Sequence, residues 1–129
     1  MREITPIQSA AAPAAVGPYS QAMACGGMLY CSGQIGLDPA SGKLVGESVE
    51  AQAEQVTKNL SAVLAAGGAQ LSDIVKANIF LVDMADFPKV NAIYAAWLGD
   101  HRPARATVAV AQLPLAARIE IDLIARIPG

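Results

Sequence analysis

The chain has 129 residues, a length that suits a single domain, residues 1–129, which buries roughly two-thirds of the surface that its unfolded form exposes. Charged residues make up 16% of the chain, against roughly 25% in an average soluble domain, so we expect other copies of the chain to cover part of the surface. The net charge of −2 argues against nucleic acid and anionic membranes as partners. No apolar run reaches the ~18 residues of a membrane span.

The N-terminal residues lack the pattern of a secretory signal. Glu3 and Pro6 stand where such a signal needs its charged and apolar regions, and we therefore expect a cytoplasmic protein. The cysteines are Cys25 and Cys31, and no histidine-rich stretch accompanies them. We interpret them as reduced, small apolar residues and expect no metal site.

The first third of the chain is predicted to form an extended segment and then a hairpin. Residues 9–18 are rich in alanine and proline, which favours an extended segment packed on the domain. Residues 19–25 and 28–35 are predicted strands. Gly26 and Gly27 join them, because glycine tolerates the positive φ of a tight turn.

Hydrophobic periodicity predicts a helix that begins after Ser48 and ends at Gly67. Its apolar residues recur at spacings of three and four: Val49, Ala53, Val56, Leu60, Val63 and Leu64. A strand is predicted over residues 74–82. A second helix is predicted to open at residues 86–88 and to stop at Gly99.

Two further strands are predicted over residues 104–112 and 118–127. The second alternates, with Ile119 and Ile121 on one face and Glu120 and Asp122 on the other. The order of elements predicts an α+β domain in which both helices pack on one face of a sheet. The other face of the sheet must then be exposed to solvent or contact another subunit.

Four polar or charged side chains on otherwise apolar segments are candidates for a site: Arg105, Glu120, Tyr19 and Ser32. Arg105 lies between small alanines that leave its guanidinium free for a ligand carboxylate, or it pairs with Glu120 or Asp122. Glu120 is a candidate general base or a solvated strand residue. Tyr19 suits the rim of a site or the core.

Ser32 and His101 have simpler interpretations. Ser32 lacks the Gly-x-Ser-x-Gly motif and a nearby histidine, so we expect a hydrogen bond to a ligand or to the protein rather than nucleophilic catalysis. His101 follows the second predicted helix, where it suits a surface or capping role.

Taken together, six short segments and their order make the whole chain resemble the RidA/YjgF family of imine and enamine deaminases. They are Gly17-Pro18-Tyr19-Ser20-Gln21-Ala22, Ser32-Gly33-Gln34-Ile35, Asp73-Ile74-Val75-Lys76, Val90-Asn91-Ala92-Ile93-Tyr94, Pro103-Ala104-Arg105 and Ile119-Glu120-Ile121. The resemblance implies a chorismate-mutase-like α+β fold and a homotrimer with clefts between subunits. It also implies hydrolysis of 2-imino acids and enamines, such as 2-aminoacrylate and 2-aminocrotonate, to 2-keto acids and ammonia.

The resemblance further implies roles for individual residues. Arg105 would bind the substrate carboxylate and Glu120 would position the attacking water. The cleft would be lined by Tyr19, Ser32, Gly33, Asn91 and Thr107. An iminium carbon is already electrophilic, so this chemistry needs no metal and no cofactor.

The chain departs from the family pattern at two places. The stretch from Trp97 to Pro103 is shorter than in well-known members, and Arg102 stands where an aromatic residue commonly precedes the proline. Thr107 replaces a cysteine found in some relatives. These departures bear on the cleft wall and therefore on substrate preference.

Three other functions compete with the deaminase. The same cleft would serve a non-catalytic sensor or carrier of 2-keto acids. Ribonuclease activity is disfavoured by the few aromatic residues and the negative net charge. A role in protein interaction would use exposed apolar surface.

Overall fold

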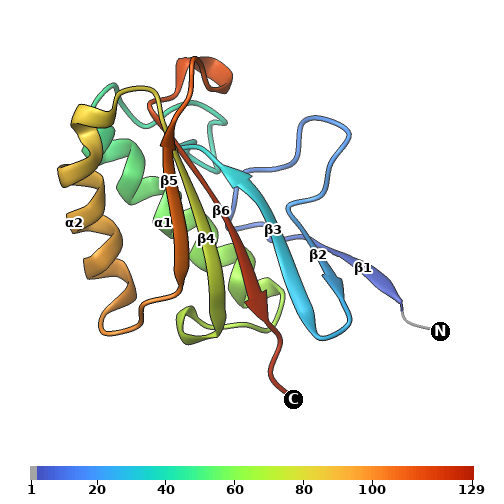
Figure 1. The fold of residues 1–129 in the computed structure, drawn as a ribbon. Helices are drawn as coiled ribbons and strands as arrows, with labels where there is room; N and C mark the ends of the chain where they lie inside the picture. Colours follow the sequence, from blue (N-terminus) through green and yellow to red (C-terminus); the bar gives the residue numbers. More distant parts are fainter. Residues whose placement is uncertain (1–2) are drawn as a thin grey trace.

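The computed structural model describes residues 3–129. Its centre is a six-stranded sheet in the order β1-β2-β3-β6-β4-β5 (Figure 1). The strands are β1 (Ile4–Ile7), β2 (Ala22–Cys25), β3 (Met28–Gln34), β4 (Ile74–Leu81), β5 (Ala104–Ala109) and β6 (Ile119–Arg126). Neighbouring strands are antiparallel, except that β4 and β5 are parallel. A helical crossover joins this parallel pair, as parallel strands require.

The helices are α1 (Val49–Ala66) and α2 (Phe87–Leu98). The Ser48 side chain accepts a hydrogen bond from the Ala51 amide at 3.1 Å and so caps α1. Pro88 occupies the first turn of α2, where its missing N–H costs nothing. Gly99 ends α2 with φ of 64°, a conformation that side-chain-bearing residues rarely adopt. No helix within residues 3–129 combines the length and the apolarity needed to cross a membrane.

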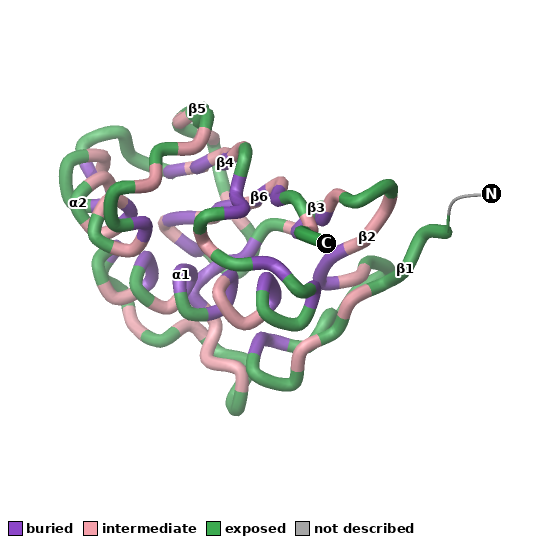
Figure 2. The backbone as a smooth tube through the Cα atoms, turned by 90° about the horizontal axis from the view of Figure 1, so that it is seen from below, coloured by how far each residue is buried: buried purple, intermediate pink, exposed green. Residues whose placement is uncertain are grey.

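The hydrophobic core lies between the two helices and one face of the sheet. Figure 2 shows α1 and α2 on the same side of the strands, with the buried backbone concentrated between them. In β6, Ile119, Ile121, Leu123 and Ala125 are at most 1% exposed and alternate with half-buried residues. This alternation confirms the predicted core face of that strand.

The opposite face of the sheet is not covered by any segment within residues 3–129 (Figure 2). Cross-strand pairing places the following side chains on this open face: Tyr30, Lys76, Asn78, Phe80, Ala106, Val108, Glu120, Asp122 and Ile124. Most of them are uncharged, and Tyr30 and Val108 are 47% and 45% exposed. The apolar members of this open face are Tyr30, Phe80, Ala106, Val108 and Ile124, and exposed apolar side chains grouped in this way are typical of a surface that another protein covers.

The structure corrects two predictions in the N-terminal third and adds a strand. The added strand is β1, for which the sequence analysis made no prediction; it lies at the edge of the sheet, where a proline such as Pro6 is tolerated. The hairpin strand begins at Ala22 rather than at residue 19. Only Ala12 and Pro13 of the alanine- and proline-rich segment are buried, whereas residues 14–18 are exposed.

The buried Gln21 explains both the late start of β2 and the course of the segment before it. The Gln21 amide accepts a hydrogen bond from the Ser9 N–H at 2.6 Å and donates one to the Pro13 carbonyl at 2.7 Å. The side chain thus takes the place of a strand partner for the segment.

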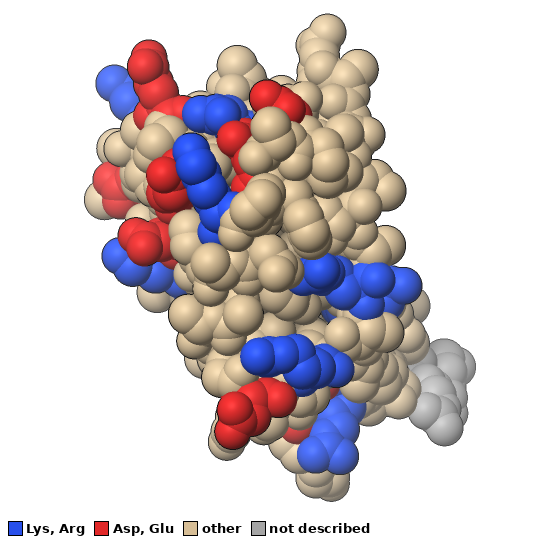
Figure 3. All heavy atoms as spheres, turned by 60° about the vertical axis from the view of Figure 1, so that its left-hand side comes forward, with Lys and Arg blue, Asp and Glu red and all other residues tan. Residues whose placement is uncertain are grey.

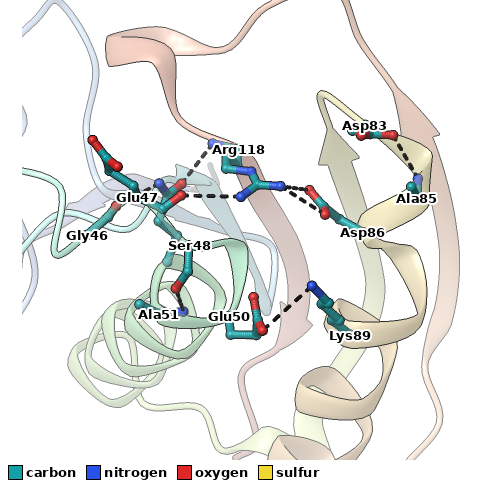
Figure 4. Close-up of polar contacts among 11 residues, drawn as sticks. Gly46, Glu47, Ser48, Glu50, Ala51, Asp83, Ala85, Asp86, Lys89 and Arg118 are labelled. Carbon is teal, nitrogen blue, oxygen red and sulfur yellow. Dashed lines mark hydrogen bonds and ion pairs between the residues drawn. The ribbon is translucent and has the colours of Figure 1, made fainter.

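A partly buried ion pair fastens the end of the sheet to the helices (Figure 4). Arg118 donates to both carboxylate oxygens of Asp86, at 3.0 and 2.8 Å, and Asp86 is buried. Arg118 also reaches the Glu47 carbonyl at 3.4 Å, just before α1. Arg118, the residue just before β6, therefore connects the residue that precedes α2 with the segment just before α1.

We expect Arg118→Met to lower the free energy of unfolding by about 2 kcal/mol, because it leaves the buried Asp86 carboxylate without its bidentate partner. Urea unfolding at a fixed protein concentration measures the change. The matched control is Lys89→Met, which breaks an exposed 3.8 Å pair with Glu50 that we expect to contribute less than about 0.5 kcal/mol. Equal effects of the two substitutions would contradict this interpretation.

Candidate functional site

The first cleft, of about 500 Å³, opens where β3 and β6 meet the N-terminal segment. It is lined by Pro13, Val16, Gly17, Tyr19, Ser32, Gly33, Gln34, Ile35, Leu37, Pro114, Leu115 and Glu120. Four of the predicted site residues therefore lie together: Tyr19, Ser32, Gly33 and Glu120. Sequence reasoning missed Leu115, which is 65% exposed and has φ of 57°. Leu115 lies in the connection between the last two predicted strands, and nothing in the local sequence indicates that this residue lines a cleft.

Glu120 is a half-buried carboxylate without a cationic partner. It forms no ion pair within residues 3–129, although it lies on a strand between two core residues. Burial raises the pKa of Glu120, and the negative charge of Asp122 raises it further. A carboxylate with these properties is a better proton acceptor than an ordinary glutamate.

Gly33 is in van der Waals contact with the Glu120 carboxyl group. A Cβ atom at position 33 would lie 2.6 Å from Oε2 and 2.8 Å from Cδ of Glu120. Only a glycine leaves room for the carboxylate in its present position.

Ser32 and Tyr19 form the rest of the polar wall. The Ser32 hydroxyl donates to the Ser20 carbonyl at 2.6 Å, so the protein already uses its proton, while its oxygen can still accept a hydrogen bond. Tyr19 is 51% exposed, which excludes the core interpretation and agrees with the rim position. Ser32 therefore holds the segment after Tyr19 against β3.

The second cleft, of about 470 Å³, lies between α2 and β5. It is lined by Asn91, Tyr94, Ala95, Arg102, Pro103 and Arg105. Arg105 donates to the Asn91 side-chain oxygen at 2.8 Å. Its Cζ atom lies 5.4 Å from the centre of the Phe87 ring and 5.2 Å from that of Tyr94. These contacts orient the guanidinium and leave most of its N–H donors free.

Arg105 and Glu120 lie on opposite faces of the sheet. Arg105 pairs across β5 and β4 with the fully buried Ala77, and its side chain contacts α2. Glu120 pairs with Phe80 of β4 on the open face. Since cross-strand partners share a face, the arginine cannot pair with Glu120 or Asp122 of the same chain, and that alternative is wrong.

Thr107 lines neither cleft. It pairs with the buried Ile79, on the helix side of β5, and its hydroxyl oxygen is buried without a hydrogen-bond partner within residues 3–129. His101 donates from Nε2 to the Ile74 carbonyl at 2.7 Å. The expectation was a surface or capping role, and this hydrogen bond instead ties the segment after α2 to the start of β4.

The cysteines are not arranged for chemistry. Both are free, and burial, with a smaller contribution from Asp122, raises the pKa of Cys31 to about 12. A thiol with this pKa stays protonated and is a poor nucleophile and metal ligand. Among residues 3–129, no three histidine, cysteine, aspartate or glutamate side chains are grouped so that they could hold a metal ion.

A protein-family model described as Endoribonuclease L-PSP matches residues 9–127. The chain belongs to this family, which is the RidA/YjgF family. Reactive Intermediate Deaminase A, chloroplastic, of Arabidopsis thaliana is 54% identical over 114 residues, which are 88% of this chain and 61% of the plant protein. The 2-iminobutanoate/2-iminopropanoate deaminase of Mus musculus is 47% identical over 119 residues, covering 92% of this chain and 88% of the mouse protein.

Solved structures of RidA/YjgF proteins have the same fold. The YjgF gene product of E. coli matches with a TM-score of 0.91 and 42% identity over 96% of this chain and 99% of that one. E. coli TdcF with bound serine matches with a TM-score of 0.90 and 35% identity over 95% of this chain and 98% of that one. The α+β sheet with two helices on one face is therefore confirmed as the YjgF fold.

Proposed function

We propose that the chain is a deaminase that hydrolyses 2-imino acids and their enamine tautomers, of the 2-aminoacrylate and 2-aminocrotonate type, to 2-keto acids and ammonia. The names of the Arabidopsis and mouse relatives support this activity. The observation that carries the proposal is the pair of unsatisfied charges in the clefts: an oriented guanidinium and an unpaired carboxylate with a raised pKa. A cytoplasmic location belongs to the same proposal and is supported by the free, buried thiol of Cys31.

In the proposed mechanism, Arg105 binds the substrate carboxylate through its free N–H donors, and Asn91 keeps the guanidinium in place. The Glu120 carboxylate accepts a proton from a water molecule as the water oxygen bonds to the imine carbon. Glu120 passes this proton to the imine nitrogen, which gives a carbinolamine. Glu120 then accepts the carbinolamine hydroxyl proton as the C=O bond forms and delivers it to the amino group as the C–N bond breaks, so the products are the 2-keto acid and ammonia. Tyr19, Ser32 and Gly33 shape the first cleft of the proposed site. Thr107 lines neither cleft of the single chain and follows Arg105 on the helix side of β5, so we propose no direct substrate contact for it.

A single chain does not bring the two charged groups to one substrate, because the sheet separates them. We therefore propose a homotrimer in which the Arg105 cleft of one copy faces the Glu120 cleft of its neighbour. The open sheet face, with its mostly uncharged side chains, supports burial between copies. On the face that Figure 3 shows, acidic and basic side chains are interspersed among mostly uncharged ones, which supports small-molecule partners rather than nucleic acid.

Mixing two inactive variants tests the shared site directly. The Arg105→Ala and Glu120→Gln variants are mixed, unfolded and refolded together to form mixed oligomers. The release of keto acid from freshly generated 2-iminobutanoate is then measured. If each site takes one residue from each of two copies, about a quarter of the sites in a random mixture have both wild-type residues. Recovered activity supports the shared site, whereas a mixture as inactive as its parents contradicts it. Light scattering of the wild type gives the copy number.

We expect Gly33→Ala to lower kcat for 2-iminobutanoate by about tenfold or more, because the new methyl group displaces the Glu120 carboxylate from its position. The backbone of the variant should be unaffected, since the clash is with the flexible end of a side chain. Thermal unfolding checks that the melting temperature stays within a few degrees of the wild type. The control is Gly46→Ala, where the nearest atom to the new Cβ would be 3.8 Å away, and its kcat should not change.

Binding without turnover is the second candidate function, because the E. coli relative was solved with bound serine. The family description also names an endoribonuclease, so RNA cleavage is measured alongside. Keto-acid release faster than the spontaneous rate, and lost in Arg105→Ala, supports the deaminase. Binding of a 2-keto acid without acceleration supports the sensor, and RNA cleavage that survives Arg105→Ala would place that activity elsewhere.

A further inference from the structure

The second cleft carries more positive charge than one carboxylate requires. Arg102 and Arg105 both line it, together with Asn91, Tyr94, Ala95 and Pro103, none of which is charged. Within residues 3–129, neither arginine forms an ion pair with a carboxylate. Two guanidinium groups in one small cleft repel each other, and an anion bound between them removes that repulsion.

Arg102 is anchored at one nitrogen and has further donors to offer. Its Nη1 donates to the Gly99 carbonyl at 2.6 Å and to the His101 carbonyl at 2.8 Å, just beyond the end of α2. A guanidinium has five N–H donors on three nitrogens, so Nε and Nη2 keep donors for a ligand. The anchoring reduces the conformational entropy that binding would cost.

Tyr94 contributes an independent sign that a ligand atom belongs here. The residue is 5% exposed, and its hydroxyl is buried without a hydrogen-bond partner within residues 3–129. Burial raises the pKa of Tyr94, although Arg105 and Arg102 act in the opposite direction. The hydroxyl is therefore a protonated donor that lacks an acceptor, in a cleft that otherwise presents mainly donors.

We propose that this cleft selects substrates with two carboxylates, namely 2-imino dicarboxylates of four or five carbons. Arg105 binds the carboxylate beside the imine carbon, and Arg102, with the Tyr94 hydroxyl, binds the distal carboxylate. The reaction is unchanged: water adds across the C=N bond, ammonia leaves, and the product is a 2-keto dicarboxylate. This inference rests on the proposed deaminase function and names its substrate class.

The test compares a dicarboxylate with a monocarboxylate substrate. Iminosuccinate, made from L-aspartate by a flavin-dependent aspartate oxidase, is compared with 2-iminobutanoate in wild type, Arg102→Gln and Arg102→Lys. Lys58→Gln, on the exposed face of α1, controls for the loss of one positive charge. Binding of the stable compounds 2-oxoglutarate and 2-oxobutanoate is measured by calorimetry in the same variants, so that recognition is followed without turnover.

We expect Arg102→Gln to raise KM for iminosuccinate by about tenfold or more and to change 2-iminobutanoate hydrolysis by less than about twofold. Arg102→Lys should restore only part of the loss, because it keeps the positive charge but not the planar fork of the guanidinium. 2-Oxoglutarate should bind more weakly to Arg102→Gln, with 2-oxobutanoate unaffected. Equal losses for both substrates would assign Arg102 a structural role at the end of α2 and overturn the inference, as would no loss for either.

The two proposals fail in different ways. If neither imine is turned over, but 2-oxoglutarate binding still depends on Arg102, the deaminase proposal fails and the dicarboxylate site stands. If both imines are turned over without dependence on Arg102, the deaminase stands and the dicarboxylate site is wrong. If the protein neither turns over the imines nor binds the keto acids, both proposals are wrong.

Discussion

Arg105→Lys is expected to lower kcat/KM for 2-imino acids by about 100-fold, because a lysine ammonium cannot reproduce the planar, bidentate pairing of a guanidinium with a carboxylate. The lysine also loses the stacking of the guanidinium between the Phe87 and Tyr94 rings. Because the Arg105 side chain is exposed in the single chain, the fold should survive the change. Steady-state kinetics of 2-iminobutanoate hydrolysis measure the effect.

The control for this prediction is Arg126→Lys, a matched substitution on β6. Arg126 pairs with Asp73 at 3.0 Å and lines neither cleft, so its variant should keep the wild-type kcat/KM. Light scattering checks that both variants retain the oligomeric state of the wild type. Unchanged turnover in Arg105→Lys would be incompatible with the proposed role of the guanidinium.

Glu120→Gln is expected to lower kcat by about 100-fold or more, because an amide cannot accept the proton of the attacking water. The variant should be at least as stable as the wild type at neutral pH. Burial and Asp122 raise the pKa of Glu120, which means that the fold favours the uncharged form, and a neutral amide avoids the cost of burying a charge. Glu54→Gln, on the exposed surface of α1, is the matched control and should be fully active.

The pH dependence of kcat/KM gives a second test of the same group. Glu120 must be ionised to act as a base, so activity should fall as the pH falls through its raised pKa. Asp122→Asn removes the smaller of the two causes of that shift, so the acid limb of the profile should move to lower pH. The substrate titrates identically with both proteins, and the difference between the two profiles isolates Glu120. A profile that does not move in Asp122→Asn would contradict its assignment as the base.

Much of the fold was predictable because its signals are local. The apolar spacing of α1, its serine cap and the glycines after it lie within a short stretch of sequence, and each confirmed boundary rests on them. The alternation in β6 likewise identified the core face of a central strand. Local sequence patterns did not indicate β1. An edge strand buries few apolar side chains and tolerates a proline, so its sequence lacks the alternation of a central strand.

The membership of the candidate site was predictable only in part. Tyr19, Ser32, Gly33 and Glu120 do line one cleft, and Asn91 and Arg105 line another. The proximity of Gly33 to the Glu120 carboxylate could not be read from the sequence, because the two residues are far apart in the chain and meet only through the pairing of β3 with β6. The unpartnered Tyr94 hydroxyl could not be predicted either, because Tyr94 is spaced by four residues from the buried Val90 and Leu98 of α2 and so resembles an ordinary core residue.

The sequence by itself determined the elements, the core face of β6 and the motifs that mark the family, because these depend on neighbouring residues. Only the tertiary structure decided that Arg105 and Glu120 lie on opposite faces of the sheet. The reason is physical: β5 is an edge strand whose small, mostly exposed residues show no alternation, so nothing local says which of its faces meets α2. The parallel pairing of β5 with β4 sets that face, and for this reason the proposed site requires a second copy of the chain.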